Sequence, residues 1–172
     1  MAYYFLISSL PVLNPLEKLP LSYNDFLEQC KPSVSESTYK QLSELSLDSH
    51  GNQLLSIWNK FYSSLIEELN YRRAEMLQKP QIFKKHDEPE IVSVIDDVFK
   101  ADNPLEAEKI MLKAQFSFLD ESVLMHYFDS YVLFGYAIKM KLMQRQQLFA
   151  FENGKNELNG LLANIQNTIQ EL

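Results

Sequence analysis

One almost continuous helical pattern runs from Asn103 to Gly154 and constrains the fold more than any other feature of the sequence. It opens with Asn103-Pro104 and two early glutamates. An Asn side chain accepts hydrogen bonds from free backbone N–H groups, Pro fits the first helical position, and carboxylates favour the positive helix end. The pattern therefore predicts a helix from Pro104 to Leu119. It also predicts a central helix of roughly 30 residues, capped by Asp120 and longer than the average globular helix.

Apolar side chains mark the buried faces of the predicted helices at steps of three and four residues. In the central helix they are Leu124, Tyr127, Phe128, Tyr131, Phe134, Ile138, Leu142 and Phe149. After Gly154, a final amphipathic helix to Leu172 is predicted from Leu158, Leu161, Leu162, Ile165 and Ile169. Earlier in the chain, a long helix from about Gln53 to Gln78 is predicted from Leu54, Trp58, Phe61, Leu65, Leu69 and Met76.

Shorter elements fill the rest of the chain. Ser22 and Ser33 are each followed by an acid three positions later, which is the capping-box signal for a helix start. Residues 89–99 are rich in β-branched side chains but place them at helical spacing behind leading acids, so we expect a helix there. Three prolines in residues 11–20 predict an extended connector, and residues 1–10 are expected to form a buried strand or a first helix.

The predicted fold is all-α. We expect an elongated array or bundle of about six or seven helices, with a short extended segment at the N-terminus as the alternative to a first helix. The chain has 172 residues, an ordinary single-domain length, and we expect one domain over residues 1–172. Residues 79–90 combine two prolines with clustered charges, which predicts an exposed loop and a hinge between residues 1–78 and 91–172.

Charge and cysteine content disfavour several classes of protein. The chain has 23 acidic and 16 basic residues and a net charge of -7, without a long basic block, which disfavours nucleic-acid binding. Its one cysteine, Cys30, cannot form an internal disulfide, which favours a reducing compartment and a buried apolar thiol. The apolar opening ends at Pro11, far short of the roughly 20 residues that span a bilayer, so we expect no direct membrane insertion.

The sequence contains no arrangement of residues that is typical of catalysis. His50, His86 and His126 have no second His or Cys at metal-ligand spacing, so we expect no metal site. His126 and Asp129 can hydrogen-bond, but an acid–base pair also needs a nucleophile or a substrate cleft that nothing in the pattern indicates. Four scattered glycines cannot build a phosphate-binding loop. We expect a protein that is not an enzyme, without catalytic residues, metal or cofactor.

Three charged residues of the helix over 53–78 are candidate partner-binding residues. Glu68 precedes Arg72 by four positions, and Arg73 lies next to it, so one of the two arginines is expected at the core boundary. Its guanidinium is expected to pair either with Glu68 in the same helix or with a carboxylate of a partner protein.

Three basic residues of the central helix are the other candidates for partner binding. Lys139, Lys141 and Arg145 make its late part basic inside an acidic protein. A docking edge for a partner explains this pattern. A solvated face that favours the negative end of the helix explains it equally well.

Five segments of the chain carry a resemblance to a known family. They are Tyr3-Tyr4-Phe5-Leu6-Ile7-Ser8-Ser9-Leu10-Pro11, Asn103-Pro104-Leu105-Glu106-Ala107-Glu108, Phe118-Leu119-Asp120-Glu121, His126-Tyr127-Phe128-Asp129 and Tyr136-Ala137-Ile138-Lys139-Met140-Lys141-Leu142. Glu68-Leu69 and Arg73-Ala74 extend the likeness through the middle of the chain. These segments resemble a bacterial family of unknown function whose genes tend to lie in V-type (archaeal-like) ATPase operons.

That family is similar to the C-type subunit of the V-type ATPase, the helical socket that couples the central shaft to the membrane rotor ring. The resemblance implies a cytoplasmic, non-catalytic accessory or central-stalk component of this proton- or sodium-transporting motor. Its partners would be other ATPase subunits, namely the shaft and the rotor ring, which would hold it at the inner membrane. The alternative is a helical adaptor or regulator that binds another protein outside the motor through the basic edge of the central helix.

Overall fold

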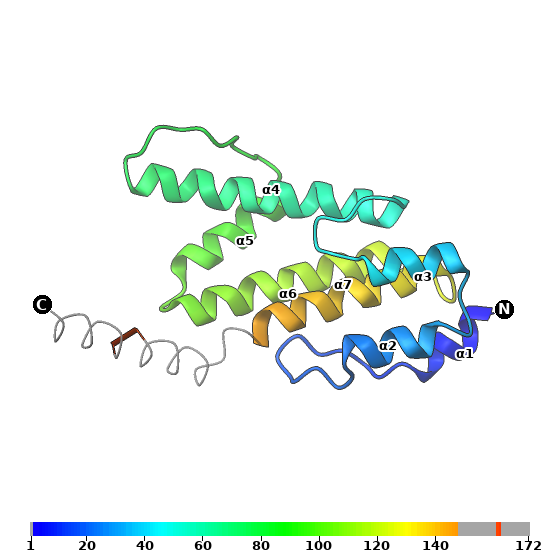
Figure 1. Cartoon of the computed structure of the whole chain (residues 1–172). Coiled ribbons are helices and arrows are strands. Elements are labelled where there is room, and N and C mark those ends of the chain that lie inside the picture. The colour runs from blue at the N-terminus through cyan, green and yellow to red at the C-terminus, as the bar shows by residue number, and fades with distance from the viewer. Residues whose placement is uncertain (1, 148–160, 163–172) are drawn as a thin grey trace, which may run out of the picture.

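The computed structural model describes residues 2–147 and 161–162, and residues 2–147 form seven helices (Figure 1). In chain order these are α1 (Ala2–Ser9), α2 (Tyr23–Cys30), α3 (Glu36–Ser43), α4 (Gln53–Met76), α5 (Pro89–Lys100), α6 (Pro104–Val123) and α7 (Ser130–Gln147). No strand occurs among the described residues. The all-α fold expected from the sequence is confirmed. Of the two structures expected for residues 1–10, a buried strand or a first helix, the structure has the helix, α1, in which Leu6 is buried but Tyr4 and Phe5 are exposed.

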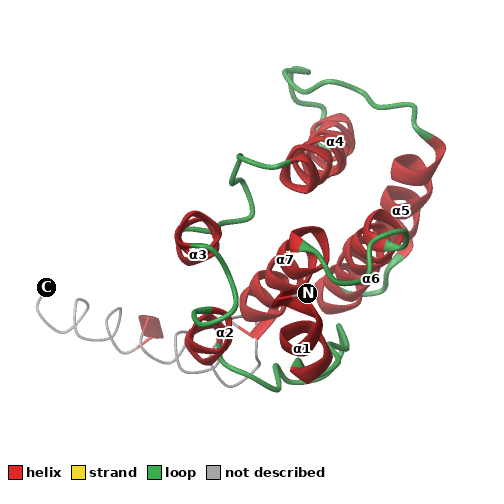
Figure 2. Cartoon of the chain, turned by 90° about the vertical axis from the view of Figure 1, so that its right-hand side faces the viewer, coloured by secondary structure: helices red, strands yellow, loops and turns green. Residues whose placement is uncertain are grey.

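The helix α7 lies at the centre of the array. It contacts α1, α2, α3, α4 and α6, whereas α5 packs against α4 and α6. Seen along the helices, α2 and α3 lie on one side of α7, with α5 and α6 on the other (Figure 2). A helix enclosed in this way is buried around most of its circumference. Its buried residues accordingly include the consecutive trio Leu133, Phe134 and Gly135.

Two hydrophobic clusters hold the helices together. The larger contains Trp58, Phe26 and Met140 and joins α1, α2, α3, α4, α6 and α7. It draws on both sides of the 79–90 loop, whose role as a hinge stays a prediction. Cys30 is buried in it as the sequence predicted, and burial raises the pKa of the thiol to about 12. The smaller cluster joins α4, α5 and α6 through Leu65, Leu69, Ile91, Ile95 and Met111.

Gln115 is a polar residue inside this packing. It is fully buried on α6, four positions from Met111 of the smaller cluster and four from Leu119 of the larger one. Neither its amide nitrogen nor its amide oxygen has a hydrogen-bond partner among the described residues. An unpaired buried amide destabilises a fold by about 1–3 kcal/mol, so Gln115 lowers the stability of the packing around it.

Side-chain caps start the helices at positions that the sequence largely predicted. Ser22 accepts a hydrogen bond from the N–H of Asp25 at the start of α2 (3.1 Å). Asn52 caps α4, and Asn103 caps α6 with Pro104 at its first positions. The helix predicted over 89–99 is also confirmed as α5. These starts are local, because each cap satisfies backbone donors within three residues of itself.

The helix start predicted at Ser33 is wrong. Ser35 caps α3 instead and accepts a hydrogen bond from the N–H of Thr38 at 3.2 Å. The N–H of Ser33 donates to the carbonyl of Cys30 at 2.9 Å, and the N–H of Val34 donates to the same carbonyl. Ser33 therefore belongs to the turn that closes α2, a role that its spacing from an acid does not reveal.

The central helix begins at Ser130, not directly after Asp120 as predicted. A turn over residues 124–129 separates α6 from α7, and the two helices then lie side by side in opposite directions (Figure 1). Asp129 stabilises the restart, because its Oδ1 accepts hydrogen bonds from the N–H groups of Tyr131 (3.0 Å) and Val132 (3.3 Å). Its other oxygen lies 2.5 Å from Nδ1 of His126.

This turn also changes which apolar residues are buried. Leu124, Tyr127 and Phe128 were expected on the buried stripe, but they are exposed. Met76, expected on the buried face of α4, is exposed as well. Helical periodicity identifies residues that share a face but not how far neighbouring helices cover it. Phe149 and most of the predicted final helix fall in 148–160 and 163–172, outside the described residues.

Candidate interaction sites

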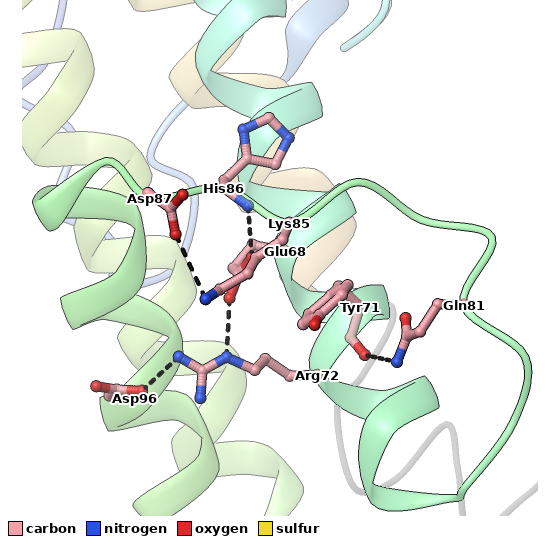
Figure 3. A network of polar contacts seen from close by, with 8 residues as sticks. All are labelled: Glu68, Tyr71, Arg72, Gln81, Lys85, His86, Asp87 and Asp96. Atoms are coloured by element: carbon pink, nitrogen blue, oxygen red, sulfur yellow. Dashed lines mark hydrogen bonds and ion pairs between the residues drawn. The ribbon is translucent and has the colours of Figure 1, made fainter.

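Glu68 is a fully buried carboxylate on α4, in a network of polar contacts that joins α4, the loop after it and α5 (Figure 3). Nε of Arg72 donates to its Oε1 at 2.8 Å, and the backbone N–H of His86 donates to its Oε2 at 2.8 Å. The guanidinium of Arg72 also pairs with Asp96 on α5 at 3.2 Å. We call Glu68, Arg72, His86 and Asp96 the Glu68 network. A buried carboxylate requires such partners, so the network fastens the α4–α5 loop and α5 to α4.

Arg72 therefore has the intramolecular partner that was one of its two predicted alternatives. The hydrogen bond to Glu68 is the main cause of a raised pKa for its guanidinium, to which the charge of Asp96 adds. Arg73, by contrast, is exposed and lines a pocket between α4 and α6. The two adjacent arginines thus have different surroundings, one inside an ion-pair network and one at the surface.

The side chain of His86 adds a second attachment of the same loop. Its Nε2 lies 2.8 Å from Glu67 Oε2, and its Nδ1 lies 3.3 Å from Glu88 Oε2. An imidazolium has two N–H donors and can satisfy both carboxylates at once. A hydrogen bond from its own backbone is the main cause of the lowered pKa of Glu88, and the charge of His86 adds to it. The sequence placed His86 in an exposed loop and did not indicate its burial.

The three basic residues of α7 each meet a different part of the chain. Lys139 forms an ion pair with Asp120 on α6. The ammonium of Lys141 lies 3.7 Å from the centre of the Tyr23 ring on α2, and burial lowers its pKa. Arg145 donates to Tyr62 Oη and to Glu108 Oε2, each at 3.2 Å. The three cations therefore have intramolecular partners on α2, α4 and α6, and their role in partner binding stays a prediction.

A group of exposed apolar side chains gathers where α1 meets the turn between α6 and α7. The Tyr4 ring lies 4.6 Å from the Phe128 ring and 5.4 Å from the Phe5 ring, between centroids. We call this group the aromatic corner; its members are 46% to 83% exposed and are Tyr4, Phe5, Leu124, Met125, Tyr127 and Phe128. Monomeric proteins rarely leave so many large apolar side chains uncovered together, so the corner is a candidate interaction surface.

The chain beside this corner is held by contacts between distant segments. Tyr136 Oη on α7 donates to the carbonyl of Pro11 at 2.9 Å, which fastens the chain after α1 to the central helix. A pocket of about 390 Å³ lies between this segment, α6 and α7, and it is lined among others by Ile7, Pro11, Asp120 and Tyr136. Four of the five segments that carry the family resemblance therefore meet in this part of the molecule.

The pair of His126 and Asp129 serves the turn before α7. His126 stacks on the Tyr131 ring, with 4.0 Å between centroids, while Asp129 caps the helix. Burial alone would raise the pKa of Asp129, but the hydrogen bond from His126 and those from the backbone lower it. Within residues 2–147 and 161–162, no group of three or more His, Cys, Asp or Glu side chains is placed to hold a metal ion.

Sequence reasoning missed the aromatic corner because it assigned these rings to a helix face. Asp129-Ser130 was the available signal, since an Asp in front of a helical pattern is a common cap.

Within the described residues, no helix has both the length and the apolar character that crossing a membrane requires. Comparison with protein-family models, with curated proteins and with solved structures finds no match to this chain. The resemblance to the ATPase-operon family stays a prediction.

Proposed function

We propose that this protein is a non-catalytic component of a larger protein assembly, which it joins through the aromatic corner. The observation that carries this proposal is a set of six exposed apolar side chains from two segments far apart in the sequence, which the contact of Tyr4 with Phe128 brings together. Tyr, Phe and Met are enriched in protein interfaces, where burying a ring contributes much of the binding free energy. The corner therefore suits contact with an apolar surface of another protein.

The charged residues around the corner indicate which kind of partner surface would be complementary to it. The first sixteen residues contain no charged side chain, and the segment over 118–130 contains Asp120, Glu121 and Asp129 but no Lys or Arg. Lys139 neutralises Asp120. The remaining rim is acidic, so the complementary partner surface is apolar with basic residues at its edge.

The family resemblance suggests the assembly: a V-type rotary ATPase, with this chain as an accessory or central-stalk component similar to the C-type subunit. Support comes from where the resembling segments lie. Tyr4 from the first segment contacts Phe128 from the fourth, and Lys139 from the fifth pairs with Asp120 from the third. Segments that carry a family likeness and meet at one exposed apolar surface are those expected to form a shared binding surface. In this proposal the protein transmits torque or supports assembly, and other subunits carry out catalysis.

The test is affinity purification of the tagged full-length protein from its own cells, with mass spectrometry of the recovered proteins. We expect ATPase subunits to be recovered with the wild-type protein. The amount of ATPase subunits recovered should fall at least tenfold with the double variant Met125→Ser/Tyr127→Ser. A loss of about 1.4 kcal/mol of binding free energy already weakens binding tenfold. Met76→Ser/Ile82→Ser is the matched control, since these two side chains are comparably exposed away from the corner.

Each outcome decides a separate part of the proposal. Equal recovery with the corner variant and the control variant would eliminate the corner as the binding surface. If the corner variant instead loses a partner that is not an ATPase subunit, the corner is still the binding surface. The protein would then be an adaptor or regulator outside the motor. Purification of the complete ATPase without this protein would exclude it as a component of the motor.

A further inference from the structure

The loop between α4 and α5 runs back beside α4 and is attached to it at His86 (Figure 3). His86 is 8% exposed, whereas residues 77–85 before it and residues 87–90 after it are all exposed. Elsewhere in the loop, Nε2 of Gln81 reaches the carbonyl of Tyr71 only at 3.5 Å. One buried histidine between two exposed stretches is therefore the main point at which this loop is held.

Both nitrogens of the His86 ring face carboxylate oxygens. Nε2 lies 2.8 Å from Oε2 of Glu67 on α4, and Nδ1 lies 3.3 Å from Oε2 of Glu88, which precedes α5. A neutral imidazole has one N–H donor, and its other nitrogen carries a lone pair that a carboxylate repels. Of the forms that the ring can take, only the doubly protonated one satisfies both contacts.

The charged groups around His86 on α4 and α5 leave one carboxylate for the ring. They are Glu67, Glu68, Arg72 and Asp96. Glu68 and Asp96 engage the guanidinium of Arg72, and the second oxygen of Glu68 accepts the backbone N–H of His86. Glu67 remains for the ring, and it also lines a pocket with Asp48 and His50.

The loop supplies the second carboxylate. Its charged groups on either side of His86 are Lys84, Lys85, Asp87 and Glu88. Nζ of Lys85 pairs with Asp87 at 3.5 Å, which leaves Glu88 for Nδ1 of His86. A hydrogen bond from its own backbone is the main cause of the lowered pKa of Glu88, so this carboxylate stays ionised at any pH above its ordinary pKa of 4.5.

We propose that His86 is a pH-sensitive latch, which holds the α4–α5 loop against α4 while its ring is doubly protonated and loosens the loop when the ring loses a proton. Histidine ordinarily changes charge between about pH 5 and pH 8. The latched loop binds this proton more tightly than the released loop, because only the latched loop places two carboxylates against the ring. The latch is therefore most stable at the acid end of that range and weakens as the pH rises through it.

Loosening of the loop has a direct structural consequence. The backbone N–H of His86, which donates to the buried carboxylate of Glu68 in the latched loop, becomes accessible to water. The latch uses none of the residues of the aromatic corner, so it is a conformational device separate from the proposed binding surface.

Amide hydrogen exchange of the full-length protein tests the latch. It is followed for the peptide over residues 79–88 from about pH 5.5 to about pH 8.5, and each rate is divided by the rate of the same unstructured peptide at that pH. We expect the protection of the wild-type loop to fall about tenfold across this range. A hydrogen bond to a charged group is strong enough to change an equilibrium about tenfold.

Two variants test the ring and its partners separately. His86→Gln keeps the backbone N–H that donates to Glu68 but cannot titrate, and Glu67→Gln/Glu88→Gln keeps the ring but removes both negative charges, which lie on half-exposed side chains. Protection of the loop should be low and independent of pH in both variants. The matched control is His50→Gln, which removes the ring that shares a pocket with Glu67 and should retain the tenfold fall.

Three results would overturn the proposal. The first is a wild-type loop whose protection stays constant or rises with pH. The second is a fall in protection that persists in His86→Gln or in Glu67→Gln/Glu88→Gln, because another group would then cause it. The third is loss of the pH dependence in His50→Gln, which would assign the titration to the other ring.

Discussion

The Glu68 network and the aromatic corner differ in which side chains they bury and which they expose. In the network, the buried carboxylate of Glu68 is satisfied within the chain by Arg72 and by the backbone N–H of His86, and Arg72 also pairs with Asp96 on α5. At the corner, apolar side chains from α1 and the 124–129 turn are exposed. Buried charges must be partnered for the fold to be stable, whereas exposed rings contribute little to stability. The contrast separates residues that serve folding from residues available to another molecule.

The largest expected effect is at the network. Glu68→Ala should lower the free energy of unfolding by about 3 kcal/mol, because it leaves the buried N–H of His86 and part of the Arg72 guanidinium without an acceptor. Urea unfolding followed by circular dichroism measures this loss. Glu67→Ala is the control; its carboxylate is about half exposed, and the expected loss is below about 1 kcal/mol. Equal losses would remove the distinction between the buried network and its surroundings.

A smaller effect on the free energy of unfolding, which depends on pH, is expected at Asp129 in the turn before α7. The pKa of Asp129 is lowered in the folded state, so its contribution to stability is complete above the ordinary value of 3.8 and is lost as the pH falls through the lower folded value. Asp129→Asn should therefore be less stable than the wild type at neutral pH and should converge with it in acid. Unfolding free energies measured from about pH 7 down to about pH 2 test this. A difference that stays constant with pH would contradict it.

The smallest effect on stability is expected at the corner itself. Met125→Ser/Tyr127→Ser should change the free energy of unfolding by no more than about 0.5 kcal/mol, because both side chains are largely exposed. The same urea experiment measures it. A loss above about 2 kcal/mol would mean that these residues support the fold, and reduced partner recovery could then no longer be assigned to a lost contact surface.

Much of the secondary structure could be predicted because its causes are local. Asn103-Pro104 starts α6 by satisfying backbone donors a few residues away, and the four-residue spacing of Glu68 and Arg72 brings their side chains together on any α-helix. The sequence alone was sufficient for the all-α class, the long helix α4 and the loop after it. None of these features depends on knowing which helices become neighbours.

The candidate sites were harder to predict because they depend on contacts between distant residues. Periodicity placed Tyr127 and Phe128 on a buried stripe, but the turn that Asp129 terminates directs them outward, beside Tyr4 from the start of the chain. His86 is buried because the carboxylates of α4 reach it, across nearly twenty residues.

The sequence by itself thus determined where helices begin and which side chains share a face. Only the tertiary structure decided which faces are covered, and by what. The physical reason is range: caps and helix faces arise from interactions within about one turn, whereas burial and ion-pair partners depend on how the whole chain packs.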